Sequence, residues 1–291
     1  MTHPDPRMQP LADNVWVYLP QWRRLEPAIG VILTSQGWVV VDSGNSPVHA
    51  GHAWDAMRRI RNVPVRYTIN THRHFDHVFG NQVFGAPVVA SRQCRKRFRA
   101  NLEDDWAPHR VQQWLQQEML PHLDALALTD FEGLVPVPPT ISFQRRLELD
   151  VGDTHLELFP SQGAHCDDHV SVFLPEERVL FVGDTFYFHE SEGAITRWLK
   201  LLDELVQWEA DTVVPGHEAP YSRISLELLR AYGHDLFETL ISSVRINVPE
   251  DEAIRQPLAK RYEDIEFLDA RTHRRLARAV YRELAARNSA P

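Results

Sequence analysis

The sequence lacks several features that would place it in particular classes of protein. Only two of its 291 residues are cysteines, Cys94 and Cys166, so no disulfide framework is expected and a reducing compartment fits. No apolar run approaches the length of a membrane-spanning helix. The polar stretch 1–10 contains three prolines and has no apolar core of signal-peptide length. We therefore expect a cytoplasmic protein.

An excess of positive charge is also missing. The chain has 31 Lys and Arg residues against 40 Asp and Glu residues, a formal net charge of −9. Nucleic-acid phosphates are usually bound by a basic surface, so this balance disfavours nucleic acid as a partner. We see no internal repeat and no low-complexity linker. We expect a small-molecule substrate and no membrane partner, and a homodimer is compatible with the sequence.

The composition is that of an ordinary globular protein, with 43% hydrophobic and 24% charged residues. Alternating or continuous apolar runs predict strands at 15–19, 28–34, 38–42, 65–70, 88–90, 141–143, 146–149, 155–159, 170–174, 179–182 and 212–214. Helical spacing predicts helices at 49–60, 80–84, 91–105, 109–128, 192–208, 223–244 and 271–286. We interpret residues 1–291 as one α/β domain with a helical insertion at about 92–140 and C-terminal helices at about 222–288.

The most informative stretch is Thr71-His72-Arg73-His74-Phe75-Asp76-His77. Three imidazoles and one carboxylate follow directly on the predicted strand 65–70. A loop that leaves a strand end can turn several side chains toward one point. His72 and His74 can share one metal ion, and Asp76 and His77 can turn toward a second point nearby. A lone pair of histidines is usually structural, but four ligand-type residues in this order are far more specific.

Three later turns add ligand-type residues near other strand ends. They are Gly163-Ala164-His165, Gly183-Asp184-Thr185 and Pro215-Gly216-His217. Glycine allows backbone turns that a side chain would obstruct. Each turn alone is ordinary, but together with the first loop they supply five histidines and two aspartates, enough for two metal ions.

This order of motifs resembles the metallo-β-lactamase superfamily, whose fold is an αββα four-layer sandwich with metals at one edge of two sheets. The resemblance implies that His72, His74 and His165 bind a first Zn²⁺ and that Asp76, His77 and His217 bind a second. Asp184 would bridge the two ions. Iron or manganese are alternatives to zinc. One departure is His165-Cys166-Asp167-Asp168-His169, where many relatives have His-Thr-x-Gly.

The bridging aspartate favours glyoxalase II-like thioesterases and lactonases over true β-lactamases. The resemblance therefore implies hydrolysis of an ester, lactone or thioester by a hydroxide shared between two zinc ions, with Asp76 orienting that hydroxide. A persulfide-dioxygenase-like enzyme with one iron and a β-lactam hydrolase remain open alternatives. A nuclease and a metal-binding scaffold without turnover are less favoured.

Several further residues have two interpretations. Tyr187 follows Asp184 at a spacing similar to that of acyl-homoserine-lactone hydrolases, which implies a catalytic hydroxyl, although packing with its aromatic neighbours is the alternative. The loop 21–26 is expected to overhang the metals, or else to be a surface loop with Trp22 packed on its own strand. Asp42 is a candidate partner for a ligand histidine. Cys166 and His169 are expected to lie behind the ligands.

Overall fold

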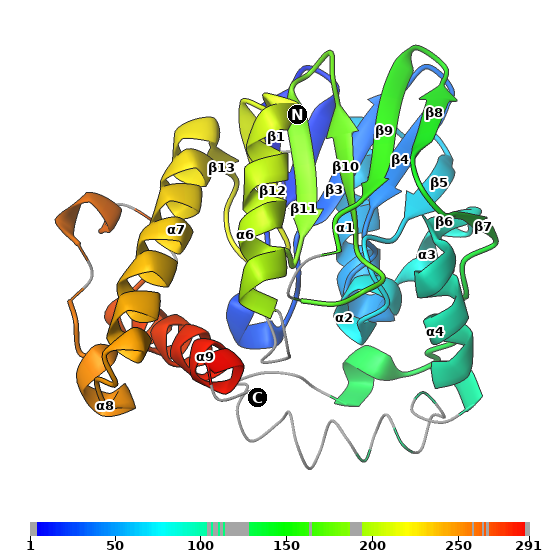
Figure 1. The fold of residues 1–291 in the computed structure, drawn as a ribbon. Coiled ribbons are helices and arrows are strands. Elements are labelled where there is room, and N and C mark those ends of the chain that lie inside the picture. The colour runs from blue at the N-terminus through cyan, green and yellow to red at the C-terminus, as the bar shows by residue number, and fades with distance from the viewer. Residues whose placement is uncertain are drawn as a thin grey trace.

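Two β-sheets form the centre of the protein in a computed structural model, which describes residues 5–103, 106, 110, 113, 128–162, 165–186, 194–257, 259–263, 265 and 268–288 (Figure 1). The first sheet has the order β1-β2-β3-β4-β5-β6-β7 and the second the order β13-β12-β11-β10-β9-β8. The first sheet consists of β1 (Met8–Ala12), β2 (Val15–Tyr18), β3 (Ile29–Thr34), β4 (Gly37–Val41), β5 (Val65–Ile69), β6 (Val88–Ser91) and β7 (Ile141–Phe143). The second consists of β8 (Leu147–Val151), β9 (Thr154–Pro160), β10 (Val170–Leu174), β11 (Val179–Gly183), β12 (Thr212–Pro215) and β13 (Tyr221–Ser222).

Both sheets are mixed, with antiparallel and parallel strand pairs. β1 to β4 pair antiparallel, whereas β4, β5, β6 and β7 pair parallel. In the second sheet, β8 to β11 pair antiparallel and β11 pairs parallel with β12. Parallel neighbours end at the same sheet edge. The loops after β5, after β11 and after β12 can therefore bring His72, Asp184 and His217 together.

The αββα sandwich expected from the sequence is confirmed by where the apolar side chains pack. The inner faces of the sheets share one core, which includes Ile32, Val39 and Ile69 from the first sheet and Leu158, Val172 from the second. The alternation of strand side chains sends their neighbours to the opposite faces. Those outer faces need helices to cover them.

Helices cover both outer faces. On the first sheet, α1 (Pro47–Ile60) and α3 (Asn81–Phe84) pack against β3 and β4, where β4 is buried at every residue as its apolar run predicted. On the second sheet, α6 (Ala194–Leu205) packs on β11, and α7 (Arg223–Arg245) and α9 (Ala270–Asn288) lie beyond it (Figure 1). Short helices α2 (Phe75–Val78), α4 (Arg92–Glu103) and α8 (Glu250–Ala253) complete the described helices, with 3₁₀ turns at 22–24, 128–131, 206–208 and 260–262.

Most expected strands and helices are present, and the differences are informative. Strand β1 was not predicted, because its Pro10 weakens a strand pattern. The structure accommodates Pro10 because β1 lies at the sheet edge, where a missing N–H costs little. The expected helix 109–128 lies almost wholly outside the described residues, so the helical insertion at 92–140 and the single-domain interpretation stay predictions.

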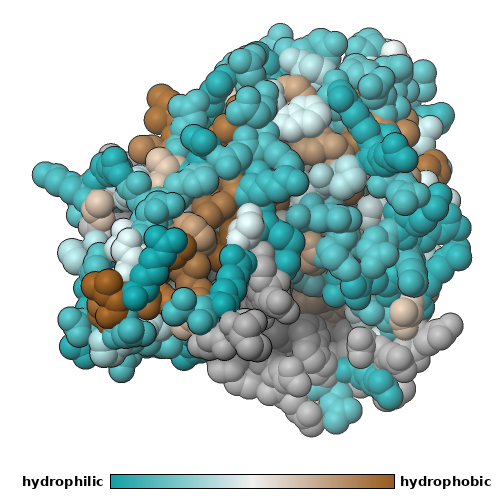
Figure 2. All heavy atoms as spheres, in the orientation of Figure 1, coloured by the Kyte–Doolittle hydropathy of each residue, from teal (hydrophilic) through white to brown (hydrophobic). Residues whose placement is uncertain are grey.

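Hydrophilic side chains cover most of the described surface in the view of Figure 2, with apolar ones in patches between them. No helix in the described part of the chain is both long enough and apolar enough to cross a membrane. The large apolar residues exposed among those described are Trp22, Ile60, Val135, Ile141, Ile224 and Ile246. Of these, Trp22 has its ring beside a histidine of the site described next.

Candidate metal centre

Four side chains from three loops form a first cluster, which comprises His72, His74, His165 and Asp184. The Nε2 atom of His165 lies 2.9 Å from Nδ1 of His74 and 3.3 Å from Nε2 of His72. The latter two nitrogens are 3.0 Å apart. Three ring nitrogens therefore converge on one point, although His165 is more than 90 residues from the other two in sequence.

A second cluster comprises Asp76, His77, Asp184 and His217. Nε2 of His217 lies 3.1 Å from Asp76 Oδ2, and Nε2 of His77 lies 3.5 Å from the same oxygen. Asp184 belongs to both clusters. Its Oδ1 is 3.3 Å from His77 Nε2, while its Oδ2 is 3.4 Å from His165 Nε2 and 3.5 Å from His217 Nε2. The carboxylate of Asp184 thus lies between the two clusters.

Two glycines make this convergence sterically feasible. A Cβ atom on Gly216 would lie 2.0 Å from Asp184 Oδ1, which is far inside contact distance. Gly183 adopts a φ of +47°, and a Cβ there would approach His169 and Thr71 within 2.7 Å. Only glycine lacks the Cβ that would collide at these positions. The sequence-based role of these glycines therefore has a definite physical basis.

Asp42 orients two histidines from behind, as the sequence suggested. Its Oδ2 accepts a hydrogen bond from Nδ1 of His77 at 2.8 Å, which directs Nε2 of that ring into the second cluster. The carboxylate also accepts the hydroxyl proton of Thr71, at 2.8 Å. Because that proton is used, the Thr71 oxygen accepts from Nδ1 of His72 at 3.0 Å. The Nε2 lone pair of His72 then faces the first cluster.

His169 supports Asp184 instead of joining either cluster, as expected. Its Nε2 accepts the backbone N–H of Asp184 at 3.2 Å, so its Nδ1 is the protonated nitrogen and donates to Ser161 Oγ at 2.9 Å. Its ring also stacks on that of His72, with centroids 5.0 Å apart. The histidine that follows Asp168 therefore fixes the start of the Asp184 loop.

The electrostatics of the two clusters differ. Burial holds the pKa of His72 well below its ordinary value and lowers that of His74 to about 4, so both rings are neutral at pH 7. Burial would likewise lower the pKa of His217, but Asp184 and Asp76 outweigh it and raise that pKa to about 9. The carboxylates thus favour positive charge at the second cluster.

The residues present fit a pair of divalent metal ions. Two zinc–nitrogen bonds of about 2.0–2.1 Å at a tetrahedral angle place their nitrogens about 3.3–3.4 Å apart. The 2.9–3.3 Å separations in the first cluster are close to this value. In addition, Nε2 of His77 and Oδ1 of Asp184 are buried and face each other at 3.3 Å without a well-formed hydrogen bond to any described residue. Buried polar atoms of this kind are costly unless a cation or proton satisfies them.

The Trp22 loop, residues 21–26, lies beside the second cluster. The Trp22 ring meets the His217 ring edge-on with centroids 5.5 Å apart, and 58% of Trp22 is exposed. Main-chain hydrogen bonds between Gln21 and Glu26 close the loop. The buried Glu26 carboxylate accepts from Arg7 at 2.7 Å and from Arg24 at 2.8 Å. The loop is therefore anchored, and the Trp22 ring lies against the His217 ring.

Other candidate residues lie away from the clusters or outside the described residues. Tyr187 is outside them, and its catalytic role stays a prediction. Burial and the neighbouring Asp168 raise the pKa of the half-buried Cys166 thiol far above its ordinary range, which disfavours a thiolate ligand at this position. In the basic run 92–99, Arg97 pairs with Asp167 and so fastens the loop that carries His165.

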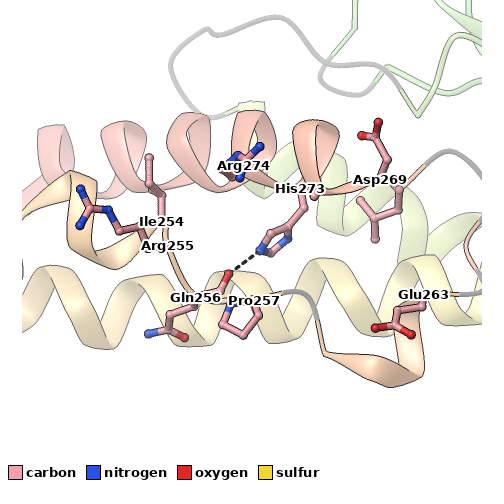
Figure 3. A pocket seen from close by; sticks show the side chains of 10 residues that line it. Ile254, Arg255, Gln256, Pro257, Glu263, Asp269, His273 and Arg274 are labelled. Carbon is pink, nitrogen blue, oxygen red and sulfur yellow. Dashed lines mark hydrogen bonds between the residues drawn. The ribbon is translucent and has the colours of Figure 1, made fainter.

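A separate cavity of about 570 Å³ lies between residues 254–257, which follow α8, and the first turns of α9, remote in sequence from both clusters (Figure 3). His273 lines it, but both nitrogens of this ring are engaged. Nε2 donates to the Gln256 carbonyl at 3.0 Å, and Nδ1 accepts from the Tyr232 hydroxyl at 2.9 Å. His273 is therefore a satisfied structural histidine, and the titratable chemistry is concentrated at the two clusters.

Sequence reasoning missed one ionic contact at the site. Asp168 is fully buried and its Oδ1 accepts from the Arg73 guanidinium at 2.8 Å. The two residues are 95 positions apart in the sequence. No local pattern pairs two charges at such a separation, because only the packing of the two sheets brings their loops together.

The part of the chain that carries both clusters matches a known protein family. The family model of the metallo-beta-lactamase superfamily matches residues 23–217, an interval that contains both clusters. A linear primary-alkylsulfatase from a Pseudomonas species is 25% identical over 222 residues, which cover 66% of this chain and 41% of that protein. The alpha subunit of a 2,4-dinitroanisole O-demethylase from a Nocardioides species is 26% identical over 197 residues, which cover 66% of this chain and 52% of that subunit. The chain thus spans about half the length of the curated relatives it matches.

Solved structures share the fold at low sequence identity. An inverting sec-alkylsulfatase from a Pseudomonas species aligns with a TM-score of 0.73 and 15% identity, covering 94% of this chain and 49% of that one. A metallo-beta-lactamase from Pontibacter korlensis aligns with a TM-score of 0.58 and 18% identity, covering 78% of this chain and 98% of that one. With a family match over most of its length, and both clusters inside that match, the chain belongs to the metallo-beta-lactamase superfamily.

Proposed function

We propose that this protein is a metal-dependent hydrolase that cleaves an ester-type bond in a small molecule. The observation that carries the proposal is the position of Asp184, whose carboxylate lies within 3.3–3.5 Å of ring nitrogens in both clusters. Two adjacent cation sites that share a carboxylate are suited to holding one water against one substrate bond.

The chain's own residues have distinct roles in this proposal. One metal would be held by His72, His74 and His165. The other would be held by Asp76, His77 and His217. Asp184 would be a ligand of both metals. Nitrogen and carboxylate donors of this kind favour zinc, with iron or manganese as alternatives. Bound there, the metals would polarise the scissile bond and lower the pKa of water. Asp76, with its carboxylate at the edge of the second cluster, would orient that water and accept its proton at a carboxylate oxygen.

The substrate class has two candidates. The bridging aspartate favours a carboxylic ester, lactone or thioester. A sulfate ester is the second candidate, because a relative of 25% identity is a linear primary-alkylsulfatase. A persulfide-dioxygenase-like centre with one iron is less favoured, because it would use only one of the two clusters. A β-lactam substrate has support only from solved structures that share the fold at 18% identity or less.

The direct test is a substrate panel on the metal-loaded full chain. The panel contains p-nitrophenyl acetate, an acyl-homoserine lactone, an acyl thioester and sodium dodecyl sulfate, with kcat/KM measured for each. We expect turnover of at least one ester-type substrate and none with the Asp76→Asn variant. Protein that carries two metals per chain and turns over none of the four would contradict the proposal.

Trp22 is predicted to contact the apolar part of the substrate, because its exposed ring stands beside His217. Trp22→Ala should raise KM about three- to tenfold with kcat nearly unchanged, since an aromatic contact is worth about 0.5–1.5 kcal/mol. Ile224→Ala is the matched control, because Ile224 is also an exposed apolar residue and lies in the first turn of α7, which is bonded to Asp211 just before β12, opposite to the end that carries His217. A Trp22→Ala enzyme with wild-type KM and a lowered melting temperature would make the loop purely structural.

A further inference from the structure

An ion pair between the buried carboxylate of Asp168 and the partly exposed guanidinium of Arg73 connects two of the loops that carry the first cluster. The carboxylate of Asp168 accepts the Arg73 guanidinium at 2.8 Å through Oδ1 and the Arg73 backbone N–H at 3.1 Å through Oδ2. Arg73 lies between His72 and His74 in the sequence, and Asp168 lies three residues after His165. The ion pair therefore links the loop that carries His72 and His74 to the loop that carries His165.

The main chain of Asp168 is held in place by Ser91 and helix α4. Its carbonyl oxygen accepts from Ser91 Oγ at 2.8 Å, and the same Ser91 oxygen accepts the backbone N–H of Cys94 at 2.9 Å, in the first turn of α4. The neighbouring Asp167 pairs with Arg97, and it accepts from Gln93 at 3.3 Å. Helix α4 thus fixes the segment that follows His165, and Asp168 reaches from this fixed segment to Arg73.

A fully buried carboxylate is costly to desolvate, and a buried ion pair is weak evidence for stability as such. What this pair does provide is geometry, because two hydrogen bonds to one residue fix both the position and the orientation of the main chain at Arg73. The three nitrogens of the first cluster lie 2.9–3.3 Å apart. A small shift of the 72–74 loop against His165 would spread them beyond what one metal can reach.

We propose that Asp168 is a positioning residue that holds the His72–His74 loop against His165 through Arg73 and so determines the metal affinity of the first cluster. The inference rests on the proposed function, in which this cluster holds a metal. It gives Asp168, which stands where many relatives have glycine, a role that the ligand residues alone do not supply.

The test compares metal affinity in Asp168→Asn and wild-type protein. The amide keeps the volume of the carboxylate but presents NH₂ to the Arg73 donors. We expect the affinity of one of two zinc sites to fall about 10- to 100-fold in competition with a chromophoric chelator. Cobalt-substituted protein should show altered visible absorption for the same site, a signal that a purely structural defect would not change selectively.

The matched control is Asp211→Asn. Asp211 pairs with Arg178 through two hydrogen bonds of 2.7 and 3.1 Å, but at the end of β11 opposite to Asp184. This variant should bind both metals as wild type does. If Asp168→Asn does not fold, the Arg73→Gln variant tests the same contact, because it removes the guanidinium from a side chain that is partly exposed. It should cause the same loss of zinc affinity.

The outcomes separate this inference from the proposed function. Wild-type zinc affinity and a wild-type cobalt spectrum in folded Asp168→Asn, or in Arg73→Gln where Asp168→Asn does not fold, would overturn the positioning role and leave the proposed function intact. A wild-type protein that binds no zinc, manganese or ferrous iron at either cluster would overturn both.

Discussion

Asp184→Asn is expected to lower kcat by more than about a hundredfold on whichever substrate is best, while the protein stays folded. Changes to residues that only support metal ligands typically cost about 10- to 100-fold, and a shared ligand should cost more. An amide keeps the shape of the carboxylate but removes the negative charge that lies between the two clusters. Metal analysis should show fewer than two ions per chain, with the shortfall growing on dialysis.

The control for this experiment is Asp203→Asn, which changes an exposed aspartate paired with Arg230 and His234 on the helical layer. It should leave metal content and kcat at their wild-type values. If Asp184→Asn retains two metals and wild-type kcat, Asp184 is only a turn residue after β11, and the two clusters do not act as one centre.

Removal of metal is expected to abolish turnover completely and to lower the melting temperature without unfolding the protein at 25 °C. The sandwich core and the helical layers are independent of the clusters, so far-UV circular dichroism should be unchanged. A ligand present at a thousand times its Kd stabilises a native state by about 4 kcal/mol, which is the scale of the expected loss. Elemental analysis before chelation should give about two transition metals per chain.

Reconstitution makes the metal experiment decisive. Zinc, manganese and ferrous iron are added separately to the apoprotein, and kcat and the melting temperature are followed to saturation. We expect both to recover together at about two equivalents. Full recovery of kcat at one equivalent of metal would contradict the two-metal arrangement. Turnover that survives chelation would contradict the metal-dependent mechanism.

Local patterns were sufficient for most of the architecture. The apolar run 38–41 predicted a strand buried on both faces, and β4 is buried throughout. Helical spacing placed α1, α6, α7 and α9 to within a few residues at the ends that lie in the described part of the chain. Strand β1 was missed because its Pro10 and polar neighbours resemble a loop, and only its place at the sheet edge makes it a strand.

The ligand-type residues were also apparent without coordinates. The stretch 71–77 concentrates four of them, and glycine-containing turns mark the other three. Asp42 was a candidate partner for a ligand histidine by resemblance to the superfamily, and the structure shows that histidine to be His77, at 2.8 Å. In each case the signal is local, because a motif or a strand followed by a turn carries its own spacing.

The sequence by itself thus determined the α/β class and the ligand-type side chains, because these follow from periodicity and short motifs. The sandwich and its hydrolytic chemistry were implied by the resemblance of those motifs to the superfamily. Only the tertiary structure decided that Trp22 stands beside His217 and that Asp168 holds Arg73. It also supplied the distances from Asp184, which the resemblance implied as a bridge, to both clusters. Trp22 and His217, like Arg73 and Asp168, are at least 95 positions apart in the sequence. Asp184 is closer to two of its neighbours, since it lies 33 positions before His217 and 19 after His165. Such contacts depend on how two separately formed sheets pack against each other, and no local pattern of residues encodes that geometry.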